Sequence, residues 1–208
     1  MNAIIASILK SKLSEIEFVD KKAGLVHTAE KSEPTDVEGA FAVRKFPISN
    51  DVDYEECFNS GAFKDLIPNS KSKGILYFED NGSVPIEGRT GSQNYRSKLR
   101  LVCWINNRMI QGNNSEPIAH LLINQIRQSL EIGYFNENNI SRIRVSSTNI
   151  VSNDLKLFSK YTYPSESLKY LMFPYEAFGI DLSVEFSIGQ SCLPDLVIES
   201  ANCNPEES

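Results

Sequence analysis

The chain has little of what catalytic and metal sites are usually built from. Its 208 residues include two histidines and four cysteines, and no two cysteines have the two- to four-residue spacing of a zinc knuckle or a redox pair. The cysteines are Cys57, Cys103, Cys192 and Cys203. The acidic residues form no calcium-loop or Glu-x-x-His pattern. We therefore expect reduced, unligated thiols, no metal or other cofactor, and no catalytic residue.

Long apolar runs and an excess of positive charge are also missing. No run reaches the about 18 apolar residues that a membrane-spanning helix needs, and Lys10 and Lys12 interrupt the apolar N-terminus before a signal-peptide core is complete. A formal net charge of −6 argues against a protein whose main task is to bind phosphate backbones. We expect a protein that is made in a cytoplasm and has no membrane partner.

Neither the one glycine-bounded loop nor the two histidines indicate an active site. The segment from Gly82 to Thr90 resembles a phosphate-binding loop, but it has five residues between its glycines where the motif has four, and it contains Pro85. His120 lies off the apolar stripe of its predicted helix, and His27 stands beside a polar loop. We expect structural roles for both histidines.

The overall composition is that of a globular protein. Hydrophobic residues make up 41% of the chain and charged residues 23%, and at this length one core is sufficient. No repeat, low-complexity block or linker divides the chain. We predict a single α+β domain over residues 1–193, with a mixed and mainly antiparallel sheet, and a loosely ordered tail over 194–208.

Two segments have the spacing of amphipathic helices. The first follows Asn2, a plausible cap, and ends between Phe18 and Gly24. Its apolar stripe is Ile5, Leu9, Leu13 and Ile16. The second begins at Ser115 and ends before Gly133, and its stripe is Ile118, Leu122, Ile126 and Leu130. We expect this central helix to pack on the sheet, with Asn124, Arg127 and Gln128 facing water or another subunit.

Alternating patterns predict several strands. The longest covers Phe178–Ile188, where apolar and polar residues alternate without a fault over about 36 Å. Shorter strands are predicted over 95–106, over 143–150, around Phe41 and Val43 with an end before Pro47, and over 75–78. Asn81-Gly82 favours a hairpin turn after the last of these, with a returning strand from Val84.

The remaining segments carry weaker patterns. Residues 24–36 are polar, which favours an exposed loop. Residues 49–73 mix apolar and loop-forming residues, and we predict short helical turns and loop there. Residues 155–175 are aromatic and contain prolines, without a clear period.

Charges are patterned on the predicted strands. Arg96, Lys98 and Arg100 share one strand face by period two, as do Arg142 and Arg144. Asp181 and Glu185 lie on the polar face of the last strand. One interpretation is a solvated face with cross-strand ion pairs, each contributing a few tenths of a kcal/mol. The other is a subunit interface between the basic and acidic faces, in which charge sets register and orientation.

The order of these elements resembles that of tail-terminator and head-to-tail neck proteins of tailed bacteriophages. The segments that carry the resemblance are the helix over 2–18, the strand Leu99–Ile105 followed by the helix over 115–131, and the closing segment 175–188. The resemblance implies a structural virion protein without enzymatic activity, assembled in the host cytoplasm. It implies a six- or twelve-fold ring that contacts other neck or tail proteins and surrounds DNA without sequence-specific contact.

Two other classes of function stay open. A small-ligand or peptide-binding α+β module is favoured if Tyr161, Tyr163, Tyr170 and Phe173 line a concave pocket. An enzyme whose site is assembled from dispersed residues is the other alternative.

Overall fold

The computed structural model combines one large sheet, one small sheet and a few helices. It describes residues 1–35, 40–54, 63–86, 92–112, 116–131, 134–137, 140–152, 155–163 and 165–189. The predicted tail over 194–208 lies outside these ranges, and so do Ser115 and Gly133, between which the second helix was predicted. Helices together with a mainly antiparallel sheet give the α+β class that the sequence predicts.

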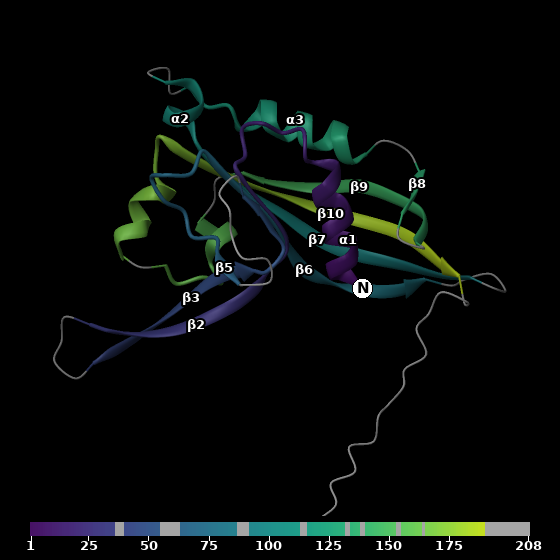
Figure 1. Cartoon of the computed structure of the whole chain (residues 1–208), viewed down its shortest axis with the longest axis horizontal. Coiled ribbons are helices and arrows are strands. Elements are labelled where there is room, and N and C mark those ends of the chain that lie inside the picture. The colour runs from purple at the N-terminus through teal and green to yellow at the C-terminus, as the bar shows by residue number, and fades with distance from the viewer. Residues whose placement is uncertain are drawn as a thin grey trace, which may run out of the picture.

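Seven strands form the large sheet. From edge to edge they are β4 (Val52–Tyr54), β1 (Lys21–Leu25), β6 (Gly74–Ile86), β7 (Ser92–Asn106), β10 (Tyr175–Gly189), β9 (Ile140–Ser152) and β8 (Tyr134–Glu137). β1 runs parallel to β6, and the other neighbouring pairs are antiparallel. Figure 1 shows the long strands crossing the middle of the molecule.

β10 is central to this sheet. Its 15 residues pair with β7 on one side and with β9 on the other. From Phe178 onward its even-numbered side chains form a row in which none is more than 3% exposed: Phe178, Ile180, Leu182, Val184, Phe186 and Ile188. The prediction of a long strand with one buried face is therefore confirmed, because an apolar row of this length is stable only when it is removed from water.

Two helices cover the face of the sheet that this row forms. α1 (Asn2–Lys12) and α3 (Ala119–Leu130) share one hydrophobic core with it. The predicted stripe of the first helix is buried, but α1 ends at Lys12 and not between Phe18 and Gly24. Beyond Lys12 the hydrogen bonds span three residues, as from the Ile16 N–H to the Leu13 carbonyl at 3.2 Å. Tighter turns thus carry the last two apolar residues into the core.

Asn2 does not cap α1, contrary to the prediction. It is the first helical residue and it is buried. Its amide donates a hydrogen bond to Asp80 Oδ1 at 2.8 Å, and its amide oxygen accepts one from the Ser97 hydroxyl. The side chain therefore connects α1 to β6 and β7 and does not bond to its own helix.

α3 packs as the sequence predicts. Leu122, Ile126 and Leu130 are buried against the sheet, and Ile118 is half-buried just before the helix begins. Between β7 and α3 the chain forms one further short helix that was not predicted, α2 (Asn107–Gln111). Its N-terminus is capped by Asn106, whose side chain accepts a hydrogen bond from the Met109 N–H.

On the outer side of α3, Asn124 and Gln128 are exposed, as predicted, but Arg127 is not free. Its Nε donates a hydrogen bond to Ser147 Oγ on β9 at 2.9 Å. Glu131, which follows α3, accepts a hydrogen bond from the Ser147 N–H at 2.6 Å. Arg127 and Glu131 therefore hold α3 to β9, while the Arg127 side chain remains 42% exposed and so faces water in part, as predicted.

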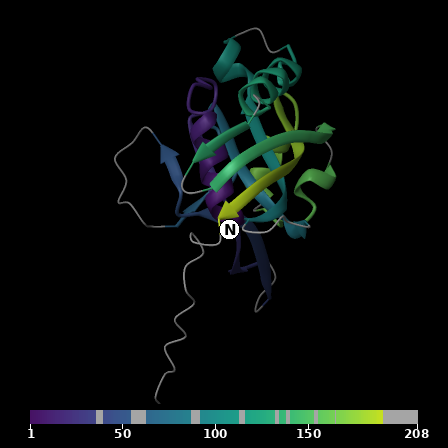
Figure 2. The ribbon, with the colours of Figure 1, turned by 90° about the vertical axis from the view of Figure 1, so that its right-hand side faces the viewer.

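The second face of the sheet is covered over part of its area. Two short 3-10 helices, η1 (Leu155–Phe158) and η2 (Ser165–Leu171), form in the segment that lacks a clear period. Beneath this segment lies a second apolar cluster that includes Ile75, Val102 and Trp104. Figure 2 shows α1 and these turns on opposite sides of the sheet. β7 was predicted to be half-buried, but it is buried on both faces from Leu101 to Asn106.

Trp104 anchors the covering segment to the sheet. Its indole N–H donates a hydrogen bond to the Tyr170 carbonyl at 2.7 Å. Its ring stacks on the ring of Tyr175, with centroids 5.4 Å apart. The indole has one donor and no acceptor, so a segment far along the chain supplies the partner that burial of the ring requires.

The small sheet begins where an exposed loop was predicted over residues 24–36. β2 (His27–Pro34) pairs with β3 (Phe41–Ser49) along eight registered positions. Neither face of β2 has a buried side chain, so the strand has no apolar alternation for the sequence to reveal. Backbone hydrogen bonds to β3 form it instead. In Figure 1 this β2–β3 ribbon projects from the body of the molecule.

β3 is longer than predicted. It continues through Pro47, whose carbonyl accepts a hydrogen bond from the Leu66 N–H at 2.9 Å next to β5 (Lys64–Asp65). The described part of residues 49–73 contains the short strands β4 and β5 and no helix, so the helical turns predicted there are wrong for that part.

β6 passes through Asn81-Gly82 without turning. Its register against β7 shifts between Asp80 and Ser83, and Gly82 has a φ of 98°. The positive φ that this pair favours is used in a β-bulge. The predicted hairpin is therefore wrong, and Val84 extends β6 itself.

Candidate functional site

The part of the second sheet face that η1 and η2 leave open is polar, and we call it the polar face. β7 contributes Arg96, Lys98 and Arg100, and β10 contributes Asp181, Ser183 and Glu185. In the register of the two strands Arg100 is opposite Asp181, Lys98 is opposite Ser183, and Arg96 is opposite Glu185. Both predicted charge rows therefore lie side by side on one face, at the centre of the sheet.

Arg100 and Asp181 form the better-shielded ion pair of this face. Arg100 Nε lies 2.6 Å from Asp181 Oδ1, and its Nη2 lies 3.1 Å from Oδ2, so the guanidinium donates two parallel hydrogen bonds. The bond to Asp181 raises the pKa of Arg100 against the opposing effect of burial. Asp181 also accepts a hydrogen bond from the Asn149 side chain on β9 at 3.3 Å.

Arg96 and Glu185 form a second pair nearer the end of the sheet. Arg96 Nη2 lies 2.6 Å from Glu185 Oε1, and the two side chains are 45% and 41% exposed. The two pairs are the cross-strand ion pairs of the first interpretation, because both are made inside one chain. Four of the charges predicted to meet across a subunit contact, those of Arg96, Arg100, Asp181 and Glu185, therefore already have partners, and that contact stays a prediction.

Lys98 stands between these two pairs without one of its own. It is exposed, it is opposite a serine, and within the described ranges no carboxylate lies at ion-pair distance from it. Among the side chains that β7 and β10 contribute to this face, three cations and two carboxylates thus leave the charge of Lys98 unmatched. The period-two pattern predicts the row, but only the strand register shows which member has no partner.

Arg142 and Arg144 do not keep the simple alternation that was predicted for them. Arg142 has a φ of 54° and lies in a β-bulge between β9 and β10, and its N–H donates to the Asn136 side chain at 2.8 Å. Both side chains are exposed, and Arg144 is opposite Glu185 in the register. Arg144 therefore lies beside the polar face, whereas Arg142 is displaced by the bulge.

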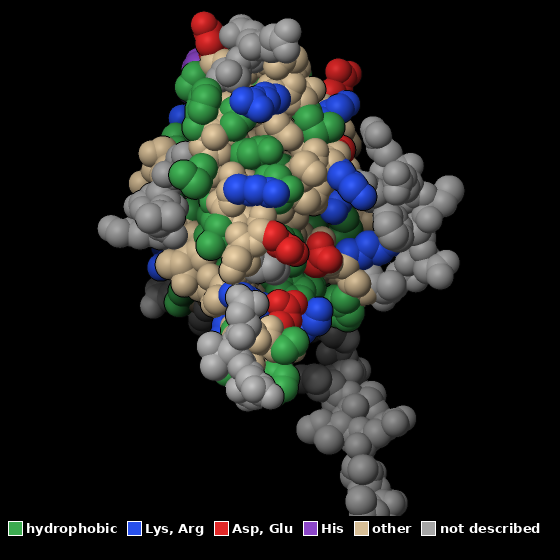
Figure 3. All heavy atoms as spheres, turned by 90° about the vertical axis from the view of Figure 1, so that its left-hand side faces the viewer, with side chains coloured by type: hydrophobic (Ala, Val, Ile, Leu, Met, Phe, Trp, Pro, Cys, Tyr) green, Lys and Arg blue, Asp and Glu red, His purple; other side chains and the backbone are tan. Residues whose placement is uncertain are grey.

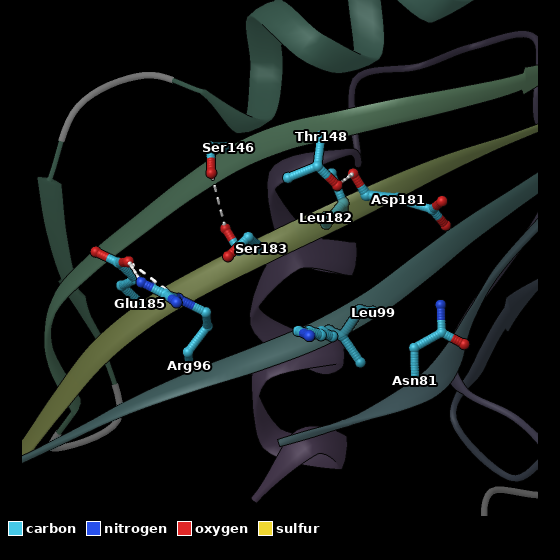
Figure 4. A pocket seen from close by; sticks show the side chains of 10 residues that line it. Asn81, Arg96, Leu99, Ser146, Thr148, Asp181, Leu182, Ser183 and Glu185 are labelled. Carbon is cyan, nitrogen blue, oxygen red and sulfur yellow. Dashed lines mark hydrogen bonds and ion pairs between the residues drawn. The ribbon is translucent and has the colours of Figure 1, made fainter. Parts of the chain in front are cut away.

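A groove of about 590 Å3 opens over the polar face. Its walls are formed by Asn81 of β6, Ser146 and Thr148 of β9, and side chains of β7 and β10. Ser146 Oγ donates to the Ser183 carbonyl at 3.3 Å, and Thr148 Oγ1 donates to the Asp181 carbonyl at 3.1 Å. Figure 4 shows these contacts and the Arg96–Glu185 pair along one side of the sheet. The groove thus combines charged groups with hydroxyl oxygens that retain lone pairs.

The tyrosines proposed as the lining of a ligand pocket do not form one. Tyr161 and Tyr163 are buried in the second apolar cluster, whereas Phe173 is 68% exposed. Tyr161 instead donates a hydrogen bond to Glu79, a carboxylate that is 3% exposed. This buried acid was missed from the sequence. The available signal was a charged residue at the end of the apolar run 75–78.

The end of the molecule that carries the β2–β3 ribbon exposes several apolar side chains. Phe41 is 70% exposed and Val43 is 47% exposed, both on β3. Leu168, Met172 and Phe173, in and after η2, are also exposed. Figure 3 looks at this end and shows hydrophobic side chains among basic and acidic ones. Exposed apolar residues that gather at one end are typical of an interaction surface.

Comparisons with known proteins add no family to this description. No family model matches the chain, and no curated protein matches it. Across the described ranges, no three His, Cys, Asp or Glu side chains are grouped so that they would hold a metal ion. None of the helices in those ranges is long and apolar enough to cross a membrane.

Proposed function

We propose that the chain is a structural virion protein of a tailed bacteriophage, which forms a ring at the head-to-tail neck or tail end and joins neighbouring rings around the DNA channel. The arrangement of elements supports this proposal. An N-terminal helix, a strand region, a helix packed on the sheet and a long closing strand follow one another in the order on which the resemblance rests. The role is one of assembly and not of catalysis.

The observation that carries the proposal is the β2–β3 ribbon. A two-stranded ribbon that projects from a domain is at best marginally stable by itself. This one has no buried side chain on β2 and exposes Phe41 and Val43 on β3. A neighbouring subunit that packs on the ribbon would bury these two side chains and hold the strands together. The ribbon is therefore the contact arm, and its partner is a second copy of the chain.

The charge of the protein supports the proposed position around DNA. With a net charge of −6, a ring of identical subunits presents an acidic surface overall. Such a surface repels phosphate groups at long range, so that DNA passes through without sequence-specific contact.

Native mass spectrometry and negative-stain microscopy test the proposal on the full chain. A ring gives a particle of six or twelve times 23.4 kDa with a central opening. The double variant Phe41→Ser with Val43→Ser keeps the fold and loses the ring. The matched control is Leu121→Ser, because Leu121 is 58% exposed on α3, away from the ribbon. A wild-type monomer, or a ring that persists in the double variant, contradicts the proposal.

A further inference from the structure

The groove over the polar face has one positive charge that the described residues do not balance. Lys98 lies between the Arg96–Glu185 and Arg100–Asp181 pairs and has no carboxylate partner in the part of the chain that the structure describes. The two arginines are already neutralised within the sheet. Among the described residues that line the groove, Lys98 therefore offers the single ammonium group without an ion pair, and the charged side chains on either side of it are paired with each other.

This arrangement favours an isolated carboxylate over a polyanion. Nucleic acid carries a charge on every nucleotide and is bound by clusters of unpaired Lys and Arg. Here the cations on either side of Lys98 are already paired with Asp181 and Glu185, so further anionic groups next to the first would find no unpaired cation among the lining residues. A ligand with one acidic group at Lys98 and neutral groups beside it matches this lining.

The other groups in the groove suit a peptide backbone. The hydroxyl hydrogens of Ser146 and Thr148 are donated to main-chain carbonyls of β10. Their oxygens retain lone pairs that can accept peptide N–H groups. Asn81 adds an amide that both donates and accepts. A peptide with an acidic side chain is thus the chemical class that matches the lining.

The chain itself contains such a peptide. Residues 190–208, which lie outside the described ranges, include no Lys, Arg or His. Their acidic residues are Asp195, Glu199, Glu206 and Glu207. Asp195 and Glu199 are flanked by neutral residues, as the groove requires.

The number of residues after β10 is sufficient for this segment to reach the groove. β10 ends at Gly189, six positions beyond Ser183, which is about 20 Å along a strand. Asp195 is six positions beyond Gly189. If the chain reverses after β10, Asp195 comes level with Lys98, and Glu199 reaches it with residues to spare.

We propose that the groove binds the acidic segment 190–208 of the same chain, with the carboxylate of Asp195 or Glu199 paired with Lys98. Attachment to β10 gives the segment a high effective concentration at the groove, so one ion pair and a few backbone hydrogen bonds suffice to hold it. The proposal concerns a single subunit and does not rest on ring formation.

Carbodiimide cross-linking of the full chain tests the proposal, because the reagent joins an ammonium group and a carboxylate only when they are in contact. An equal mixture of unlabelled and 15N-labelled protein is cross-linked and digested, and the products are identified by mass spectrometry. The expected product joins Lys98 to Asp195 or Glu199 within one isotopic form. Absence of this product, or a product of which about half joins differently labelled chains, as random pairing between copies gives, overturns the proposal. The second of these results assigns the groove to a segment of another copy.

Amide hydrogen exchange supplies a second readout that does not depend on the reactivity of Lys98. In the wild-type chain, amides of residues 193–200 are expected to exchange more slowly than in the Lys98→Glu variant. Lys71→Glu is the matched control, because Lys71 is also exposed but lies away from the groove lining, and it should leave the rates unchanged. Equal rates in wild type and Lys98→Glu overturn the proposal. Neither experiment changes with the mass of the assembly, so its result is independent of the test of the ring.

Discussion

Tyr161 donates a hydrogen bond to Glu79 at 2.7 Å, from the segment that covers the sheet to a carboxylate on the sheet itself. The second oxygen of Glu79 lies 2.7 Å from Lys160 Nζ. Burial of an acid without partners is costly, so the two residues of the covering segment stabilise the charge beneath them. Docking of the segment and burial of Glu79 therefore depend on each other.

Removal of the Tyr161 hydroxyl should destabilise the protein by about 1–3 kcal/mol, because Tyr161→Phe leaves a buried carboxylate with one partner fewer. The measurement is the free energy of unfolding from urea titration. Tyr170→Phe is the control, since Tyr170 lies in the same segment but its ring is less buried than that of Tyr161. An equal decrease in the free energy of unfolding in the two variants would show that the hydrogen bond to Glu79 does not contribute more than the contacts of the Tyr170 hydroxyl.

Three of the eight tyrosines should resist ionisation while the protein is folded. Burial raises the pKa of Tyr77, Tyr161 and Tyr163, and nearby Glu79 adds to the effect. A raised pKa in the folded state means that these phenols stabilise the fold below their unfolded pKa of about 10 and lose this contribution as the pH rises above it. In an absorbance titration, up to five tyrosines ionise reversibly and three ionise only with unfolding. Reversible ionisation of all eight would contradict the burial of this group.

Val184→Asp should cost more than about 3 kcal/mol, because it places an unpaired charge in the central row of β10. Ser183→Asp is the matched control, since Ser183 is on the other face of the strand and opposite Lys98. Its melting temperature should stay close to that of the wild type. A Val184→Asp protein that melts within a couple of degrees of wild type would contradict the central position of β10.

The two cross-strand ion pairs should differ in strength. A double-mutant cycle with alanine at Arg100 and Asp181 should give a coupling energy of about 1 kcal/mol, because these side chains are only 27% and 23% exposed and their two hydrogen bonds join separate oxygens of the carboxylate. The more exposed Arg96–Glu185 pair should give a few tenths of a kcal/mol, decreasing further in high salt. A larger coupling energy for Arg96–Glu185 than for Arg100–Asp181 would contradict the prediction that burial makes the second pair stronger.

Glu131 should make stability depend on pH in the acidic range. Burial alone opposes its ionisation, but hydrogen bonds from Ser147 and the charge of Arg127 outweigh this and lower its pKa. A lowered pKa in the folded state stabilises the protein above the unfolded value of about 4.3, and this contribution is lost as the pH falls through the folded value. The stability difference between wild type and Glu131→Gln should therefore be present at pH 7 and shrink below about pH 4. A difference that does not change with pH would show that the charge of Glu131 has no role.

The sequence predicts those helices and strands in which buried apolar residues recur at a regular spacing. Ile180 and Val184 on β10, and Leu122 and Ile126 on α3, reveal their strand and helix because one face of each is apolar. β2 gives no such signal, since backbone pairing with β3 forms it. Gly82 has the positive φ that the Asn81-Gly82 pair predicts. Because β6 pairs with β7 on both sides of this position, the result is a β-bulge and not a hairpin turn.

The sequence predicts that charged residues form rows on the strands of the candidate site, but it does not predict which of them form ion pairs. Arg96, Lys98 and Arg100 share a face by period two, which the sequence alone shows. Which of them meets a carboxylate depends on the register of β7 against β10, two strands that are separated by the whole of α3 and β9. Lys98 therefore becomes distinctive only once Ser183 is placed opposite it.

The fluorescence of Trp104 on β7 reports on whether the covering segment, residues 155–175, is packed on the sheet. Trp104 is the one tryptophan of the chain, and its indole is bonded to Tyr170 and stacked on Tyr175. Its fluorescence therefore comes from a single, chemically defined place and shifts to longer wavelength when water reaches the ring. Release of residues 155–175 from the sheet can thus be followed in real time without any label, separately from the unfolding of the helices on the opposite face.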